Sequence, residues 1–273
     1  MADSAVWPTP AGSPAPTPAT GTALLEASGI TKRFAGINAL DDVSLTVRSG
    51  ELVALIGPNG AGKTTFFNCL LGILRPDAGE VTFAGADLMP LQVHERARLG
   101  LGRTFQRIEL FIGMTVREHL LVAAQARRCR GAFFRDLLGV SKPNAEDRQL
   151  CDATLELVGL VEVADRPAES LSLGRGRLVE LARALMCQPT LLFLDEPSSG
   201  LDHRETDEMC QVMTTVQAER GTAILLVEHD VPMVERLAQR TYVIDVGRMI
   251  ADGPTNDVLA LPAVRAAYLG QGV

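Results

Sequence analysis

Apolar residues along this chain follow two kinds of pattern. Short continuous runs, such as LVALI at Leu52–Ile56 and TLLFLD at residues 190–195, have the length of strands buried on both faces. Similar runs occupy residues 222–230 and Arg240–Asp245. The segments between them carry apolar residues three and four positions apart, which predicts helices. Strands that alternate with helices are typical of an α/β protein with a mainly parallel sheet.

The middle of the chain follows a different pattern. Strand-like runs disappear between about residues 107 and 178, and helical patterns occupy residues 115–128 and 145–160. A further amphipathic helix is predicted at residues 171–186, although its start is rich in glycine and arginine. Ser172 is an ordinary helix N-cap by sequence alone. We therefore expect a helical insertion within an α/β core.

These patterns give a simple domain organisation. Residues 1–22 contain five prolines among small polar residues and predict a flexible, partly extended tail rather than a secretory signal. Residues 23–270 are expected to form one domain, with residues 23–106 and 179–270 as its core and about 107–178 as a helical subdomain. The apolar runs fall well short of the roughly 18 residues that span a bilayer.

Charge and cysteine content exclude some classes of function. The chain of 273 residues has 26 basic and 33 acidic side chains, a net charge of −7, which disfavours a broad surface for binding nucleic acid. Its five cysteines are scattered along the sequence without close pairs. Neither a disulfide framework nor a zinc site is indicated, and a reducing compartment fits best.

The segment GPNGAGKTT, after the strand Leu52–Ile56, matches a phosphate-binding loop. Its glycines let backbone N–H groups turn toward phosphate oxygens, and a helix is expected to begin at about Lys63. Lys63 would reach the β- and γ-phosphates, and the Thr64 hydroxyl would bind Mg²⁺. The expected phosphate-binding residues are Gly57, Pro58, Asn59, Gly60, Ala61, Gly62, Lys63, Thr64 and Thr65.

Two adjacent carboxylates end the buried strand of the segment LLFLDEP. Neighbouring strand residues face opposite ways, so Asp195 can hold Mg²⁺ while Glu196 acts as general base on a water. Paired acids at a strand end often only begin a loop. After a phosphate-binding loop in an α/β chain, we interpret them as catalytic. By themselves, Gln106 in RTFQ and His229 in VEHD would be a surface amide and a structural or exposed histidine.

Six motifs taken in order resemble those of the nucleotide-binding subunit of ABC transporters, over residues of about 24 to 270. They are GPNGAGKTT, RTFQ, LSLGRGR, LLFLDEP, SSGLD and VEHD. The resemblance implies a P-loop NTPase core with a mainly parallel sheet, an N-terminal antiparallel β subdomain and an inserted α-helical subdomain. It also implies the ligands ATP and Mg²⁺.

Roles for three further residues follow from this resemblance. Gln106 matches the Q-loop glutamine, which contacts Mg²⁺ and responds to the membrane subunits. His229 matches the switch histidine that contacts the γ-phosphate. Phe34, in TKRFAG, matches the aromatic residue that stacks on adenine.

The segment LSLGR stands where the family carries its signature LSGGQ, and this explains the unusual start of the helix at residues 171–186. Two such subunits pair head to tail in the family, so Ser172, Gly174 and the helix dipole would address the γ-phosphate held by a partner. Asp202 would lie in the loop that crosses the same interface. Arg175 and Gly176 depart from the family signature, where glutamine is usual.

The resemblance implies an ATPase on the cytoplasmic face of the cell membrane. Its partners would be a second ATP-binding subunit, identical or different, two transmembrane permease subunits and an extracytoplasmic solute-binding protein. Segments such as RTFQRIELFIGMTVREHLLVA resemble importers of branched-chain or hydrophobic amino acids. Urea or amide import, lipopolysaccharide export, a non-transport ABC ATPase and a P-loop kinase are the alternatives.

Overall fold

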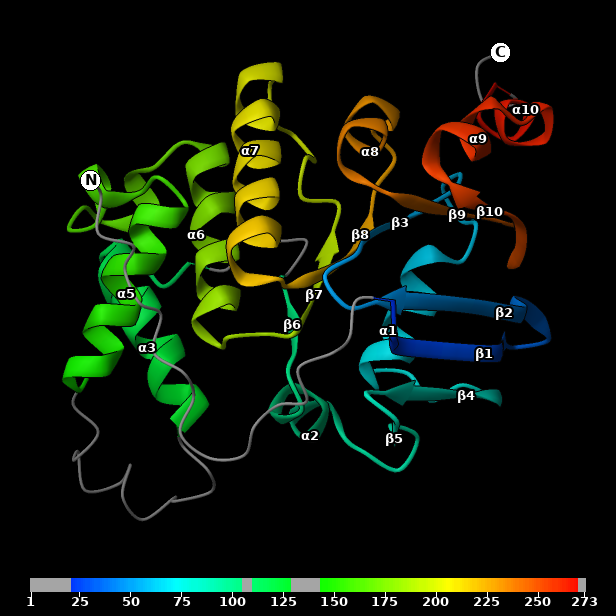
Figure 1. Cartoon of the computed structure of the whole chain (residues 1–273), viewed down its shortest axis with the longest axis horizontal. Coiled ribbons are helices and arrows are strands. Elements are labelled where there is room, and N and C mark those ends of the chain that lie inside the picture. Colours follow the sequence, from blue (N-terminus) through cyan, green and yellow to red (C-terminus); the bar gives the residue numbers. More distant parts are fainter. Residues whose placement is uncertain (1–20, 105–109, 129–142, 270–273) are drawn as a thin grey trace.

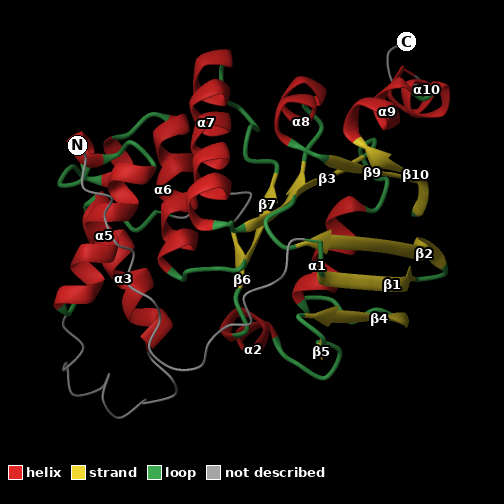
Figure 2. Cartoon of the chain, viewed as in Figure 1, coloured by secondary structure: helices red, strands yellow, loops and turns green. Residues whose placement is uncertain are grey.

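The computed structural model describes residues 21–104, 110–128 and 143–269, which form two sheets and a group of helices (Figures 1 and 2). The strands are β1 Ala23–Phe34, β2 Ile37–Arg48, β3 Leu52–Ile56, β4 Ala78–Phe83, β5 Ala86–Asp87, β6 Leu101–Arg103, β7 Leu191–Asp195, β8 Ala223–Val227, β9 Arg240–Asp245 and β10 Arg248–Pro254. The α-helices are α1 Lys63–Leu71, α2 Val93–Arg98, α3 Val116–Arg128, α5 Ala145–Leu157, α6 Leu173–Met186, α7 His203–Arg220, α8 Val231–Leu237, α9 Thr255–Ala260 and α10 Pro262–Leu269. Short 3-10 turns lie at Val161–Val163 and Ala168–Ser170. Over the described ranges, every helix is too short or too polar to cross a membrane.

The larger sheet has six strands in the order β10-β9-β3-β8-β7-β6. The five strands from β9 to β6 run parallel, and β10 pairs antiparallel with β9. All residues of β3, β7 and β8 are buried, as expected of strands covered on both faces. The mainly parallel sheet predicted from the sequence is therefore confirmed.

One predicted strand is too long. The apolar pattern favoured a strand through residue 230, but β8 ends at Val227. The Glu228 carboxylate accepts hydrogen bonds from the backbone N–H groups of His229 and Asp230, at 2.9 and 3.2 Å. These donors are therefore taken by a side chain, and the chain turns into α8.

The smaller sheet has four antiparallel strands in the order β2-β1-β4-β5. Its strands β1 and β2 have 12 residues each. Side chains from these strands, from α1 and from one face of β3 form one hydrophobic core, with Phe66 and Phe67 of α1 fully buried in it. The helix α1 thus packs between the two sheets (Figure 1).

A second hydrophobic core lies on the other face of the large sheet. There α6 packs against α3, α5, α7 and β7 through buried residues such as Leu120, Leu150, Val179, Leu192 and Met213. Figure 2 shows α3, α5 and α6 grouped at one end of the molecule. In the described part of residues 107–178, the only β pairing is an isolated bridge between Thr115 and Pro167.

The domain boundaries remain proposals. The expected boundary at residues 178 and 179 falls inside α6, which belongs to the helical group but also packs on the sheet. Of the tail expected at residues 1–22, residues 1–20 lie outside the described residues.

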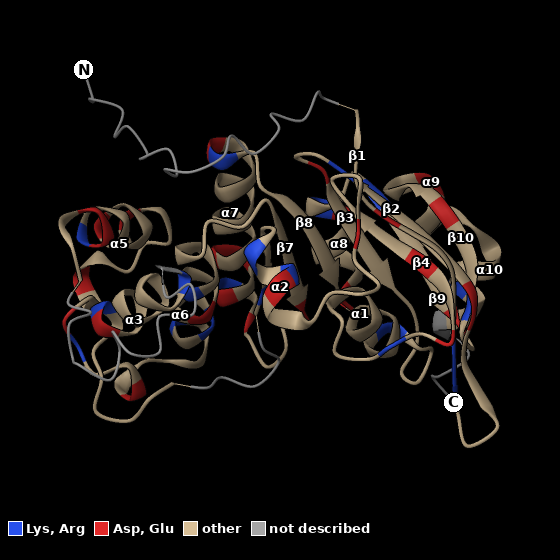
Figure 3. Ribbon diagram, turned by 90° about the horizontal axis from the view of Figure 1, so that it is seen from below, with Lys and Arg blue, Asp and Glu red and all other residues tan. Residues whose placement is uncertain are grey.

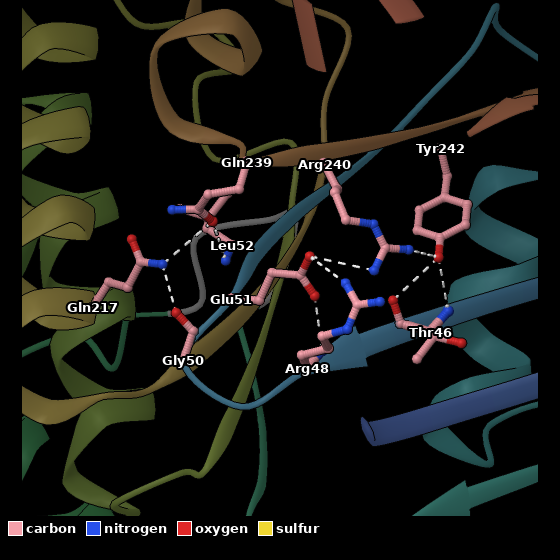
Figure 4. Close-up of polar contacts among 9 residues, drawn as sticks. All are labelled: Thr46, Arg48, Gly50, Glu51, Leu52, Gln217, Gln239, Arg240 and Tyr242. Atoms are coloured by element: carbon pink, nitrogen blue, oxygen red, sulfur yellow. Dashed lines mark hydrogen bonds and ion pairs between the residues drawn. The ribbon is translucent and has the colours of Figure 1, made fainter. Parts of the chain in front are cut away.

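Polar side chains bond to the backbone around the start of β3 (Figure 4). The Gln239 carboxamide oxygen accepts the backbone N–H of Leu52 at 2.6 Å, and the Gln217 amide donates to the carbonyl of Gly50 at 2.7 Å. These bonds fix the start of β3 relative to α7 and β9.

Tyr242 of β9 links the two sheets beside these contacts (Figure 4). Its hydroxyl accepts the backbone N–H of Thr46 in β2 at 3.1 Å, donates to the Thr46 carbonyl at 3.3 Å, and also contacts Arg240. Arg240 in turn lies 3.4 Å from the carboxylate of Glu51. The buried hydroxyl therefore connects the four-stranded antiparallel sheet to the six-stranded sheet.

Replacing Tyr242 with phenylalanine is expected to lower the free energy of unfolding by about 1–2 kcal/mol, because it leaves buried polar partners unpaired. Denaturant titration measures this loss. The control is Thr46→Val, which keeps the backbone groups that bond to Tyr242 and should cost less. Equal losses in the two variants would contradict the role given to the tyrosine hydroxyl.

Candidate functional site

The segment after β3 forms a tight loop that requires glycine. Gly57, Gly60 and Gly62 have positive φ angles of 154°, 80° and 106°. A Cβ on Gly57 would lie 2.0 Å from the Ile244 carbonyl oxygen, and one on Gly62 would lie 2.6 Å from that of Ala39. The loop is therefore held closely between β9 and β2. The helix α1 begins directly after it, without a side-chain cap or an acidic residue in its first turn.

Lys63 is the first residue of α1 and is only 6% exposed. Its ammonium donates to the carbonyls of Gly57 and Pro58, at 2.6 and 3.0 Å, so it lies across the loop. Burial lowers the pKa of Lys63, and the charges of Glu196, Asp195 and Glu228 partly offset this effect. The loop thus presents a cation and an uncapped helix start, both of which favour phosphate.

Asp195 ends β7 and is 3% exposed. Burial raises the pKa of this carboxyl group, and the guanidinium of Arg103, with a nitrogen 3.5 Å away, opposes the shift. Arg103 ends β6, donates to the Asn68 side chain at 3.3 Å and lies over the Phe67 ring. The buried Asp195 carboxylate therefore needs a neighbouring positive charge to stay ionised, and Arg103 supplies one.

This arrangement fits Mg²⁺. Asp195 offers a buried carboxylate and Thr64 an exposed hydroxyl in the first turn of α1. Mg²⁺ prefers oxygen ligands and is usually held by one or two protein groups together with substrate phosphates. The sequence did not reveal Arg103, although it stands in the segment GRTF. Gln106, the third predicted metal contact, lies outside the described residues.

Glu196 follows Asp195 with a φ of 48°, in the left-handed region that non-glycine residues rarely adopt. Its backbone N–H donates to Val227 at 2.9 Å, so the chain turns sharply beside the end of β8. One Glu196 carboxylate oxygen lies 3.9 Å from the Nδ1 atom of His229. Strained residues of this kind gather at functional sites. The fold brings together the two residues that the sequence separated.

Glu228 was missed by the sequence analysis. Its carboxylate is 0% exposed and accepts four hydrogen bonds: from the N–H and hydroxyl of Ser198, at 2.9 and 2.5 Å, and from the N–H groups of His229 and Asp230. It therefore fixes the turn after Glu196 and the position of His229. The sequence did contain a signal for Glu228, because this acidic residue directly follows a buried strand and precedes a histidine.

The nucleotide-base and signature residues lie apart from this cluster. Phe34 is 44% exposed at the end of β1, close to Lys32. Ser172 caps α6 and Asp202 caps α7, while Gly174 is buried in the first turn of α6. Figure 1 shows α1, which begins after the phosphate-binding loop, and α6, which begins after Ser172, on opposite sides of β6 and β7.

Charged side chains do not separate by sign over the ribbon. Figure 3 shows acidic and basic positions interspersed on the helices and strands seen from that side. The charges that bear on the site are instead local. The charge of Lys63 is close enough to interact with Asp195, Glu196 and Glu228, and Arg103 pairs with Asp195.

Comparison with known proteins agrees with this geometry. The ABC transporter family model matches residues 40–199. Over 250 residues, the chain is 41% identical to LivG, a high-affinity branched-chain amino acid transport ATP-binding protein of Salmonella typhimurium, covering 91% of this chain and 98% of that protein. The corresponding protein BraF of Pseudomonas aeruginosa is 39% identical over 251 residues, with the same coverage.

A more distant relative and a solved structure extend the comparison. The lipopolysaccharide export system ATP-binding protein LptB of Haemophilus influenzae is 33% identical over 91% of this chain and 98% of its own. The ADP conformation of MJ1267, an ATP-binding cassette of an ABC transporter, superposes with a TM-score of 0.78 at 32% identity. It covers 91% of this chain and 99% of that one.

Replacing Glu228 with glutamine is expected to lower the free energy of unfolding by about 1–3 kcal/mol, because an amide NH₂ would face buried N–H donors. ATP hydrolysis should fall as well, since the variant releases the turn that carries His229. The control is Glu235→Gln, which removes a charge from an exposed position on α8. Thermal unfolding and ATPase assays check both effects, and unchanged behaviour of the Glu228 variant would refute its positioning role.

Proposed function

The chain belongs to the ABC transporter family as an ATP-binding subunit that hydrolyses ATP to power transport, and we propose that it serves an importer of branched-chain or other hydrophobic amino acids. One observation carries this proposal: identity of 39–41% to LivG and BraF extends over 98% of their length. Lipopolysaccharide export is the second candidate because LptB also matches, but at 33% identity. Urea or amide import stays a third.

The phosphate-binding loop would hold ATP. Backbone N–H groups of residues 57–65 and the start of α1 would surround the phosphates, while Lys63 would exchange its bonds to Gly57 and Pro58 for phosphate oxygens. Phe34, which is partly exposed, would stack on adenine. Thr64, Asp195 and Gln106 would hold Mg²⁺, which supplies neutralising charge on the phosphate oxygens.

Glu196 is the proposed general base. Its carboxylate is 20% exposed and its position next to His229 suits removal of a proton from a water aimed at the γ-phosphate. Asp195, which faces the buried side, would stay with the metal. His229, which is 54% exposed, would reach the γ-phosphate. The two adjacent acids would therefore serve different purposes: Asp195 ends the buried strand β7, whereas Glu196 stands in the turn after it with a positive φ.

A second ATP-binding subunit would complete the site. Ser172 and Gly174 stand at the start of α6, which lies across β6 and β7 from α1 in Figure 1, and they would face the γ-phosphate of a partner, with Asp202 at the same interface. Two transmembrane permease subunits and an extracytoplasmic solute-binding protein would make up the transporter. We place the subunit on the cytoplasmic face of the membrane.

Reconstitution tests the transported solute. The chain is co-expressed with the permease and binding-protein genes adjacent to its own, and uptake into proteoliposomes is measured with radiolabelled leucine and urea. We expect ATP-dependent leucine uptake. Uptake of urea alone would favour amide import, and transfer of lipopolysaccharide out of the membrane would favour export; either result would refute the amino acid proposal.

Replacing Glu196 with glutamine is expected to lower steady-state turnover by a factor on the order of 100 or more, because the base is lost while the side-chain shape remains. ATP binding should persist, and an ATP-bound dimer should accumulate. Fluorescent-nucleotide binding, hydrolysis rates and light scattering measure these effects. Lys63→Ala is the contrasting control, since it should lose nucleotide binding itself. Near-normal single-turnover hydrolysis in Glu196→Gln would exclude Glu196 as the base.

A further inference from the structure

The start of α6 already carries a carboxylate from the same chain. One oxygen of Glu205 accepts hydrogen bonds from the Ser172 hydroxyl and from the Gly174 backbone N–H, each at 3.1 Å. Glu205 lies in the first turn of α7, which runs beside α6 (Figure 1). The two signature residues that would address a phosphate are thus both occupied by Glu205.

The sequence positions Glu205 for this contact. Asp202 is the N-cap of α7, and its side chain accepts the backbone N–H of Glu205 at 2.8 Å. The second Glu205 oxygen lies 3.5 Å from the backbone nitrogen of Asp202, which closes a capping box. Glu205 therefore bridges the start of α6 and the start of α7.

Gly174 is required for this close approach. A Cβ on Gly174 would lie 2.6 Å from the carboxyl carbon of Glu205 and 2.7 Å from the bonded oxygen. Any larger residue would displace the carboxylate from its donors. The glycine at this position consequently admits an anion to the helix start, and in the described structure that anion is Glu205.

A carboxylate and a phosphate would compete for the same hydrogen-bond donors at the start of α6. Both accept hydrogen bonds from a hydroxyl and from backbone N–H groups, and both are favoured by the positive end of a helix dipole. The Ser172 hydroxyl has one proton to donate, and the Gly174 N–H has one. Two anions held at this point would also repel each other.

We propose that Glu205 is a displaceable internal anion: it holds Ser172 and Gly174 in the separate subunit and leaves them when the nucleotide γ-phosphate of a second ATP-binding subunit arrives. This inference rests on the proposed head-to-tail pairing. Glu205 acts through Ser172 and Gly174 and is a positioning residue. Its departure also opens the capping box at Asp202, so that phosphate arrival at α6 is transmitted to the start of α7.

The proposal predicts that removing the charge of Glu205 favours ATP-driven pairing. In the Glu196→Gln background, Glu205→Gln should lower the ATP concentration for half-maximal dimer formation by at least about threefold, because a neutral amide competes less well with phosphate. Light scattering measures the dimer. Nucleotide affinity of the dilute monomer, measured with a fluorescent ATP analogue, should not change.

Glu208→Gln is the matched control. Glu208 lies one turn further along α7 and pairs with Arg204 of the same helix at 3.2 Å. Its variant loses the same charge and should leave the half-maximal concentration unchanged. Glu205→Ala, which also removes the acceptor, should shift dimer formation in the same direction as Glu205→Gln.

The outcomes separate this inference from the function on which it rests. If Glu196→Gln dimerises with ATP but Glu205→Gln leaves the half-maximal concentration unchanged or raises it, the displaceable-anion proposal is wrong while the pairing stands. If Glu196→Gln does not dimerise at any ATP concentration, both fail. A shift of the same size in Glu208→Gln would assign the effect to net charge alone and would also overturn the proposal.

Discussion

Three neighbouring strands, β3, β8 and β7, run parallel in register, and the candidate site depends on this pairing. Because parallel strands end at the same edge of a sheet, the phosphate-binding loop, the Glu228–His229 segment and the Asp195–Glu196 pair meet there. Segments separated by more than a hundred residues thus form one site. At the amino end of β3, the Gln239 side chain accepts the N–H of Leu52, and the Gln217 side chain donates to the carbonyl of Gly50.

Charge compensation at this edge has a common physical cause. A buried charge is costly unless an opposite charge or several hydrogen-bond donors face it. Asp195 has Arg103 and Lys63 nearby, and Glu228 has four donors. Glu228 is satisfied within the chain and therefore holds backbone in place. Under the proposed function, bound phosphate and metal would take over the contacts of Asp195 and Lys63.

The ends of α6 and α7 show the same principle at a different location. The start of a helix has N–H groups without partners, and an acidic side chain satisfies them. Glu205 does so for both helices. Under the proposed pairing, the Ser172 and Gly174 donors that this contact occupies would face a second subunit, so Glu205 would connect local helix capping with assembly.

The sequence by itself determined the elements and much of the chemistry. The phosphate-binding loop, the start of α1 at Lys63, the strand Leu52–Ile56 and the acids Asp195 and Glu196 follow from local spacing, because loop and strand geometry depend on neighbouring residues. The family resemblance, confirmed by the match over residues 40–199, added the fold.

Only the tertiary structure decided which residues hold the predicted site residues in place. The sequence analysis gave no role to Arg103, Glu228 or Glu205, although Arg103 lies in RTFQ and Glu228 in VEHD, because each contacts a partner 30 or more positions away. The end of β8 at Val227 has a local cause instead, since the Glu228 side chain accepts the N–H groups of the next two residues. Apolar periodicity reports which face of an element is buried, but hydrogen bonds between distant segments depend on how those elements pack.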